Sequence, residues 1–299
     1  MANRRPPQPS RRPRDLAPGE LARAPAYKLV LEYEGTRYRG FQEQKNARTV
    51  AGEILAAAGK IANRPATELY GSGRTDAGVH ALAQVAHLDL ETKLKPDALR
   101  FALNDGLPAD IHVRAVEPVS HRFHARRSAE ARSYLYQIAR RRTAFLKPFV
   151  WWIKDPLDFQ VMRRAAAVFE GMHDFRSFTQ DDPDEKSTRV QMEAPQLADA
   201  GDLILLRIQG SHFVWKLVRR LVGVLAEVGR GSLSVAEVSR FLVEDSETPA
   251  RLTAPPSGLF LERVFYEGDA RAWPLVPALD PTRDRAVSAS SGRARPSAP

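Results

Sequence analysis

Residues 27–118 carry strand-like and helix-like patterns in a fixed order, which constrains the fold more than any other feature of the sequence. The run YKLVLEYE at 27–34 alternates apolar with polar residues until Gly35, which is typical of a strand. Thr49 precedes apolar residues at helical spacing and predicts an N-capped helix that ends near Pro65. The remaining patterns predict strands at about 66–71, 84–90 and 111–118 and a helix near 96–103. This order is ferredoxin-like and predicts an α+β layer with helices on one face of an antiparallel sheet.

The second half of the chain repeats this theme more loosely. Strands are expected near 131–139, 190–197, 203–209 and 258–267, and helices near 158–170, 213–228 and 234–243. We therefore predict an α+β fold of two similar ferredoxin-like or RNP-like halves with antiparallel sheets and a central cleft. The expected divisions are a disordered basic tail over 1–25, an N-terminal domain over 26–119, a C-terminal domain over 120–270 and a disordered tail over 271–299. The acidic, polar segment 179–189 is expected to be a mobile loop.

Positive charge is concentrated in one segment of the chain. The net charge is +9, from 45 Lys and Arg against 36 Asp and Glu, and the ends at 1–25 and 275–299 carry +4 and +2 of it. Residues 121–142 alone hold seven Arg against one Glu, with Tyr134 and Tyr136 among them. Guanidinium groups suit phosphate and aromatic rings suit nucleobases, so an RNA or DNA partner is favoured over a solvated basic surface. No amphipathic helix joins the segment, which argues against a membrane surface.

The composition excludes several classes of protein. The chain contains no Cys, which rules out disulfides, cysteine-ligated zinc, iron–sulfur clusters and thiol nucleophiles, and which fits a reducing cytoplasm. The Arg- and Pro-rich N-terminus lacks the apolar stretch of a secretory signal, and no apolar run approaches the roughly 20 residues of a membrane span. We therefore expect a soluble cytoplasmic protein of about two domains.

The turn at 71–80 reads GSGRTDAGVH and lies between two expected strands. A phosphate-binding loop needs a helix directly after its glycines and a Lys-Ser/Thr ending, so a nucleotide loop is disfavoured. The glycines permit a tight turn that lifts Asp76 away from the strand ends, with Arg74 two residues before it. From composition alone, an ordinary hairpin turn is the commoner interpretation. His80 is expected to be structural, because no second His or carboxylate stands at metal-ligand spacing.

Four segments together resemble the tRNA pseudouridine synthase A (TruA) family: GRTDAGVH in this turn, LEYEGTRYRGFQEQ upstream, and FHARRSAEARSYLY and FVWKLVRRLVG downstream. The resemblance runs in order over about residues 27–267 and leaves out only the two tails. It implies an isomerase that converts uridine to pseudouridine at positions 38, 39 and 40 in the anticodon stem-loop of tRNA. It further implies a homodimer that needs no cofactor or metal and that binds neither DNA nor a membrane.

The family motifs also imply roles for residues of this sequence. The resemblance implies that Asp76 is the catalytic nucleophile, that Tyr134 is an active-site tyrosine and that Arg219 is an active-site arginine. Two positions depart from the family pattern. Leu217 replaces the usual Met before this arginine, which conserves volume, and Ala51 replaces a Gln at the start of the first helix, so any contact made by that Gln is missing.

The reaction gives these residue types a physical rationale. Breaking the N1–C1′ bond and rejoining the base through C5 leaves the redox state unchanged, and an ionised carboxylate can act as the nucleophile. Burial disfavours an ionised carboxyl, so Asp76 needs a guanidinium nearby; Arg219 is the candidate, although a solvated helix residue fits its spacing equally well. Tyr134 is expected to stack on the base and take part in transfer of the C5 proton, or to be a half-buried strand aromatic.

Three further residues are expected to bind the RNA. Arg74 contacts a phosphate or forms a structural salt bridge, Arg126 belongs to the basic segment, and Leu259 supplies an apolar wall or packs in the core. A paired base is out of reach inside a helix, so the target uridine must flip out of the stack.

Three alternative functions stay open. A noncatalytic RNA-binding or RNA-chaperoning protein would keep the fold and the basic segment but would not need the Asp76 carboxylate. A pseudouridine synthase that acts on ribosomal or small nuclear RNA is the second. A glycoside hydrolase is the most distant, because no second carboxylate is evident near Asp76.

Overall fold

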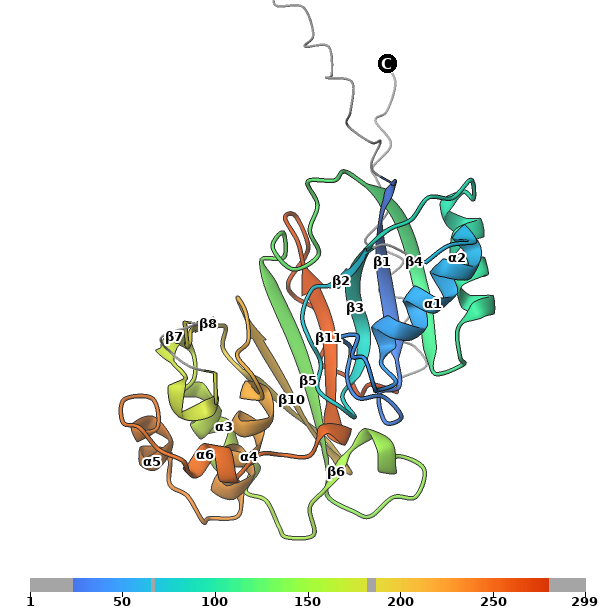
Figure 1. Ribbon diagram of the computed structural model, residues 1–299. Helices are drawn as coiled ribbons and strands as arrows, with labels where there is room; N and C mark the ends of the chain where they lie inside the picture. The colour runs from blue at the N-terminus through green and yellow to red at the C-terminus, as the bar shows by residue number, and fades with distance from the viewer. Residues whose placement is uncertain (1–23, 66–67, 182–186, 280–299) are drawn as a thin grey trace, which may run out of the picture.

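The N-terminal half folds in the order that its sequence patterns predict. The computed structural model describes residues 24–65, 68–181 and 187–279. Its first elements are β1 (Ala26–Tyr33), α1 (Val50–Ala62), β2 (Glu68–Gly71), β3 (His80–Asp89), α2 (Pro96–Gly106) and β4 (Ile111–Val119). Strands β4, β1 and β3 lie side by side in that order, β2 also pairs with β3, and all these pairs are antiparallel (Figure 1). This is the expected ferredoxin-like strand order.

Local signals set both ends of α1. The Thr49 side chain accepts a 3.2 Å hydrogen bond from the Gly52 amide, as expected for an N-cap. At the other end, Asn63 adopts a left-handed backbone with φ 51°, and its amide bonds back to the carbonyl of Lys60. The helix therefore ends before Pro65, as predicted.

The second half contains more elements than its sequence patterns predict. They are β5 (Ala131–Ala139), β6 (Trp151–Trp152), α3 (Phe159–Ala167), β7 (Gly171–Asp174), β8 (Arg189–Met192), β9 (Gln196–Ala200), β10 (Leu203–Gly210), α4 (Leu217–Gly229), α5 (Val235–Arg240), α6 (Thr248–Arg251) and β11 (Leu259–Phe265). Short 3₁₀ turns occupy Lys147–Phe149, Arg176–Phe178 and Pro256–Gly258. The strand order β11-β5-β10-β8 has the same connectivity pattern as β4-β1-β3-β2, and β7 follows at the edge.

Two of these elements have other bounds than the sequence predicts. The strand expected at 190–197 is divided into β8 and β9, which pair with different parts of β10. The helix expected from residue 213 begins at Leu217, because Lys216 has a left-handed backbone with φ 58° that an α-helix cannot include. The preceding residues from 213 form a loop, and this loop becomes part of the site.

A single mixed sheet replaces the separate antiparallel sheets that the sequence predicts. Strand β11 pairs antiparallel with β5 and parallel with β3, where Phe260 lies opposite His80. The short β2 covers only the Ala86–Asp89 part of β3, so the beginning of β3 is left for β11. Strand β11 therefore joins the two halves into one sheet of eleven strands within the described residues (Figure 1).

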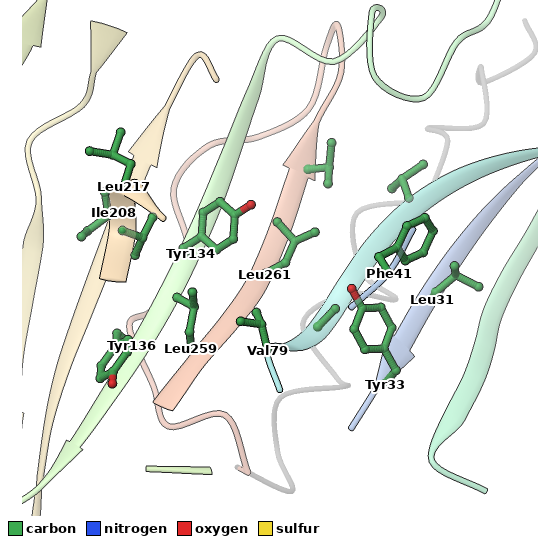
Figure 2. Close-up of a cluster of buried hydrophobic side chains, with 14 of the residues drawn as sticks. Leu31, Tyr33, Phe41, Val79, Tyr134, Tyr136, Ile208, Leu217, Leu259 and Leu261 are labelled. Carbon is green, nitrogen blue, oxygen red and sulfur yellow. The ribbon is translucent and has the colours of Figure 1, made fainter. Parts of the chain in front are cut away.

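One hydrophobic core runs along the face of the sheet that the helices cover. Figure 2 shows its middle, where Tyr33, Leu261 and Tyr134 project from neighbouring parts of the sheet. On β5 the residues alternate, so that Tyr134 and Tyr136 lie in this core and Leu135 lies in a second cluster on the opposite face. The even-numbered positions of β5 therefore face the helices and the site.

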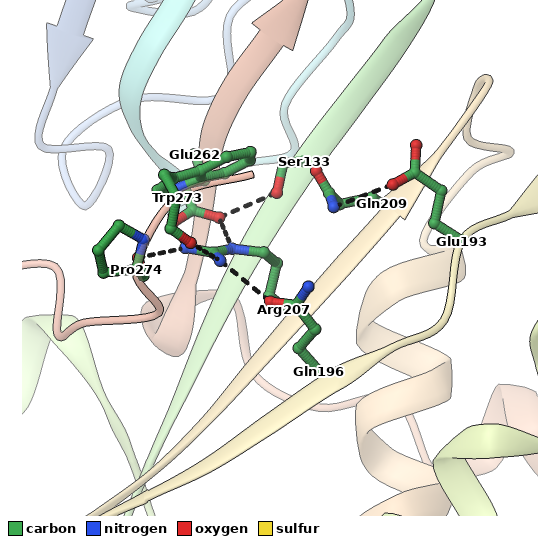
Figure 3. A network of polar contacts seen from close by, with 8 residues as sticks. All are labelled: Ser133, Glu193, Gln196, Arg207, Gln209, Glu262, Trp273 and Pro274. Atoms are coloured by element: carbon green, nitrogen blue, oxygen red, sulfur yellow. Dashed lines mark hydrogen bonds and ion pairs between the residues drawn. The ribbon is translucent and has the colours of Figure 1, made fainter. Parts of the chain in front are cut away.

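The opposite face carries a buried ion pair that is covered by the C-terminal segment (Figure 3). Arg207 on β10 bonds to both carboxylate oxygens of Glu262 on β11 at 2.8 Å, and both side chains are 1% exposed. The Arg207 guanidinium also donates to the carbonyls of Trp273 and Pro274 and lies 4.1 Å from the centroid of a Trp273 ring. The Ala278 amide donates to the Gln137 side chain at 2.8 Å.

The disordered tail expected from residue 271 is therefore wrong for 271–279, which pack on the sheet because Arg207 needs acceptors beyond Glu262. The rest of that expected tail, and the tail expected over 1–25 as far as residue 23, lie outside the described residues, as does the middle of the expected loop at 179–189. Across the described ranges, no helix has the length and apolar character needed to cross a bilayer. The long helices α1 and α4 have 13 residues each.

Candidate active site

The turn between β2 and β3 presents Asp76 and is held from both sides. The Phe41 amide donates to the carbonyl of Thr75 at 3.1 Å, and the Thr75 hydroxyl lies 2.8 Å from the hydroxyl of Tyr33. The chain then closes through a bond from the Val79 amide to the Asp76 carbonyl, with Gly78 between them at φ 78°. The carboxylate of Asp76 is thus carried by a fixed backbone, as the glycine pattern predicts.

Arg132 fixes the other end of this turn, and sequence reasoning missed it. Its guanidinium is buried and donates to four carbonyls, those of Ser72, Arg126, Ala129 and Ser211, at 2.6–3.2 Å. Burial lowers the pKa of the Arg132 guanidinium from its very high usual value. The alternation of β5 is one signal that could have indicated its burial. Arg132 lies two residues before the inward-facing Tyr134 and therefore faces the same side of the sheet.

Arg219 forms an ion pair with Asp76 across a separation of 143 residues. Its Nη1 lies 3.1 Å from Oδ2 of Asp76, and its Nε donates to the carbonyl of Ala254 at 2.7 Å. The Ala254 amide returns a 3.0 Å bond to the carbonyl of Arg219. The Nε bond to Ala254 therefore fixes the guanidinium while its Nη1 points at the Asp76 carboxylate. Helix α4 is buried on almost every side, so the side opposite its apolar stripe faces this turn rather than solvent.

Tyr134 lies next to this pair on the core face of β5. Its ring packs edge-on against Phe213 with centroids 4.8 Å apart, and only 8% of the residue is exposed. Burial raises the pKa of the Tyr134 hydroxyl to about 12; the charge of Arg132 opposes this shift and that of Asp76 adds to it. The hydroxyl therefore stays protonated at neutral pH.

A cavity of about 230 Å³ brings all six predicted site residues together: Arg74, Asp76, Arg126, Tyr134, Arg219 and Leu259. Arg74 and Arg126 are exposed at its rim, whereas Leu259 is buried in its wall. The volume is below the roughly 300–1,000 Å³ of sites for drug-sized ligands, so it suits one small planar group. The arrangement combines a carboxylate, a guanidinium and an aromatic ring around that space.

The loop before α4 forms a wall of the cavity that the sequence did not reveal. It contributes His212 to Lys216, and the Trp215 amide donates to a carboxylate oxygen of Asp181 at 2.9 Å. The Lys216 ammonium lies 3.9 Å from a ring centroid of Trp215. Arg220, in the first turn of α4, is 1% exposed, and neither its Nε nor its Nη1 has a hydrogen-bond partner among the described residues. Burial lowers the pKa of its guanidinium.

His80 occupies a structural position, as its sequence context indicates. Its Nδ1 accepts a 3.0 Å bond from the Gly35 amide, and its Nε2 donates to the carbonyl of Pro148 at 2.8 Å. Burial lowers the pKa of this ring, which keeps it neutral. In the described part of the chain, no group of three or more His, Cys, Asp or Glu side chains has the arrangement of a metal site.

The arginines of the basic segment 121–142, which the sequence concentrates in one part of the chain, do not form one surface. Arg126 and its neighbours in the loop are exposed beside the cavity, whereas Arg132 is buried. Arg140 and Arg141, beyond the far end of β5, are paired with carboxylates of the β9–β10 hairpin. Because β5 spans nine residues, these two groups lie at opposite ends of a strand.

Known proteins match this chain over most of its described length. The family model for tRNA pseudouridine synthase matches residues 29–126 and 165–267. A tRNA pseudouridine synthase A from Limosilactobacillus reuteri (strain DSM 20016) is 40% identical over 80% of this chain and 96% of its own length. Another from Geobacillus sp. (strain WCH70) is 38% identical over 80% of this chain and 98% of its own length.

A solved structure of a Cbf5-Nop10-Gar1 complex gives a TM-score of 0.29 at 13% identity, over 70% of this chain and 54% of that one, a likeness too weak to support an argument. The sequence matches are decisive by themselves, because the matched regions contain the Asp76 turn, β11 and α4. By these matches, this chain belongs to the tRNA pseudouridine synthase family, a family of isomerases.

Proposed function

We propose that this protein converts uridine to pseudouridine at positions 38, 39 and 40 of the tRNA anticodon stem-loop, with Asp76 as the nucleophile. The observation that carries the proposal is the Asp76–Arg219 pair at 3.1 Å inside a cavity that also contains Tyr134. A binding protein has no need for a carboxylate held in this way. The family membership supports tRNA as the class of substrate.

The ion pair positions the nucleophile. The Arg219 guanidinium donates to the Asp76 carboxylate, and its second bond, to the carbonyl of Ala254, fixes the orientation of the guanidinium. The carboxylate forms a covalent bond to the uridine, the N1–C1′ bond breaks, the base rotates and rejoins C1′ through C5, and the bond between the carboxylate and the nucleotide breaks. The C5 proton is then lost while N1 gains one, so the conversion is an isomerisation with no change in redox state.

Tyr134 holds the base in this scheme. Its protonated hydroxyl is a poor acceptor for the C5 proton, because burial raises its pKa to about 12. We therefore assign the ring to packing against the uracil, and we assign the C5 proton to the Asp76 carboxylate after its bond to the nucleotide has broken. Leu259 and Phe213 supply further apolar contacts in the cavity wall.

The exposed arginines at the rim bind the flipped nucleotide. Arg74 and Arg126 line the cavity and are exposed, and guanidinium groups suit phosphate oxygens, which supports contacts with the RNA backbone. We include in the proposal a cytoplasmic homodimer and two similar halves, over 26–119 and 120–270, with the cavity in a cleft between them. The repeated strand order and the origin of Asp76 and Arg219 in different halves support that division.

The test uses unmodified tRNA transcripts that carry tritium at uridine C5. The wild-type protein should release tritium without added cofactor, and mapping should place pseudouridine in the anticodon stem-loop. Asp76→Asn should bind the same tRNA and release none. Binding by the wild type without release from any tRNA would reject the tRNA enzyme, and release from ribosomal or small nuclear RNA alone would identify a different substrate. Liberation of free uracil would instead indicate a glycoside hydrolase.

A further inference from the structure

Three aromatic rings pack together outside the cavity, where β2 meets the loop that precedes β5. Tyr70 on β2 stacks on His87, its cross-strand neighbour on β3, with centroids 5.2 Å apart. The His124 ring lies 4.7 Å from His87 and 5.7 Å from Tyr70. Tyr70 is 45% exposed, whereas His87 is buried beneath it. We call Tyr70, His87 and His124 the Tyr70 platform.

Hydrogen bonds fix the two histidine rings of the platform. Nδ1 of His87 accepts from the Ala125 amide at 3.1 Å, and Nδ1 of His124 accepts from the Arg126 amide at 3.2 Å. A ring that accepts at Nδ1 carries its proton on Nε2 and is neutral, and burial lowers the pKa of both imidazoles. The platform therefore presents a rigid aromatic surface that has no charge of its own.

Arginines flank this surface and connect it to the catalytic turn. Arg122, Arg126 and Arg127 are exposed on the loop that carries His124, part of the green connection between β4 and β5 in Figure 1. Arg126 also lines the cavity, and its carbonyl accepts a bond from Arg132. The other bond of that same Arg132 nitrogen goes to the carbonyl of Ser72. One side chain thus joins the loop that carries His124 to the Asp76 turn.

We propose that the Tyr70 platform is a second RNA-binding site, which stacks an unpaired nucleobase of the substrate outside the catalytic cavity while Arg126 and Arg127 contact its phosphates. This inference rests on the proposed function. An exposed, rigid aromatic ring with guanidinium groups around it is the arrangement that binds unpaired bases in RNA. Glu68 is exposed on β2 two residues from Tyr70, so positive charge predominates without being uniform.

Phe101 on α2 provides a matched control. It is also an exposed aromatic side chain, at 57%, with the Arg100 guanidinium 4.3 Å from its ring centroid. It lies outside the cavity lining and outside the platform. Its removal takes away an exposed ring beside an arginine without touching either site.

The experiment compares Tyr70→Ala, Tyr70→Ile, Tyr70→Phe and Phe101→Ala in the full-length protein. Loss of a stacked base should raise the KM for tRNA about tenfold in Tyr70→Ala, with kcat unchanged, because stacking is a binding contribution remote from the reacting atoms. Tyr70→Ile removes the ring but keeps a residue that favours a strand, so it should show the same loss, whereas Tyr70→Phe and Phe101→Ala should stay within about twofold of wild type. Photo-crosslinking of tRNA that contains 5-iodouridine should label Tyr70 itself.

Each outcome decides the proposal. A wild-type KM for tRNA in both Tyr70→Ala and Tyr70→Ile overturns the proposal, and so does an equal rise of KM in Phe101→Ala. The alternative would then be a surface for a protein partner. A selective loss with a crosslink to Tyr70 supports the proposal. If wild-type protein releases no tritium, the proposed function fails separately, and the same variants are compared by direct tRNA binding, where the same selective loss would still support an RNA-binding platform.

Discussion

The guanidinium of Arg132 donates a 2.9 Å hydrogen bond to the carbonyl oxygen of Ser72 and thereby ties β5 to the turn that carries Asp76. Three further carbonyl oxygens accept hydrogen bonds from the same guanidinium. Arg132→Met should lower the free energy of unfolding by about 2–4 kcal/mol, because buried acceptors lose their donor. Urea denaturation measures this. Arg141→Met is the control, since that exposed surface pair should contribute less than about 1 kcal/mol. Equal losses of stability in the two variants would contradict the structural role of Arg132.

The Asp76–Arg219 pair predicts a defect in turnover rather than in binding. Arg219→Lys keeps the charge but cannot hold Ala254 and Asp76 at the same time, as the guanidinium does. We expect kcat to fall about a hundredfold, with KM for tRNA changed by less than about threefold. Single-turnover tritium release separates the two constants. A raised KM with normal kcat would show instead that Arg219 binds the RNA backbone.

Tyr134 predicts a specific response to alkaline pH. Its pKa is raised to about 12 by burial, above the ordinary value of 10.0, so the unfolded state loses the proton first as pH rises. The stability that this group contributes is complete below pH 10 and is lost as pH rises toward 12. For Tyr134 alone the loss of stability between pH 8 and pH 11 is on the order of 1 kcal/mol.

Tyr134→Phe should therefore lose less stability than wild type over that interval, as measured by urea denaturation at both values. The variant also tests the assigned role, because a ring that only packs against the base needs no hydroxyl. Activity near that of wild type in Tyr134→Phe, with a large loss in Tyr134→Ala, is the expected pattern. Equal losses in both would assign the proton transfer to the hydroxyl.

Because Arg207 and Glu262 form a buried ion pair, we expect the effects of substituting them on the free energy of unfolding to be strongly non-additive. Glu262→Gln leaves a buried guanidinium without its carboxylate and should cost about 3–5 kcal/mol of unfolding free energy. The double variant Arg207→Met, Glu262→Leu should recover much of that loss, because apolar residues replace both charges. A double-mutant cycle of Arg207→Met, Glu262→Leu and the double variant, measured by urea denaturation, gives the coupling energy of the pair. Additive effects would contradict it.

Local sequence patterns predict much of this fold because they act over a few residues. The Thr49 cap, the alternation of β1 and the glycine-rich turn around Asp76 all depend on near neighbours. The site residues were identified through family motifs, and the cavity contains all six. Their catalytic roles remain predictions until the variants are measured.

The features that the sequence did not reveal depend on contacts between distant segments. The alternation of β5 indicates which face Arg132 takes, but the acceptors Ser72 and Ser211 that bury its guanidinium come from distant segments, as does the Glu262 partner of Arg207. The pairing of β11 with β3 likewise depends on the shortness of β2, and the packing of Trp273 depends on the Arg207 side chain. Composition indicated a disordered tail there because it does not register such contacts.

The position of β11 has a consequence for synthesis on the ribosome. This strand, Leu259–Phe265, is the last in the described part of the chain, yet it is the one that bridges β3 and β5. A nascent chain therefore exposes its arginines well before it can complete the cavity, which forms only after β11 has been synthesised. Chains truncated before Leu259 lack both the bridging strand and a wall of the site, so they cannot assemble the catalytic cavity.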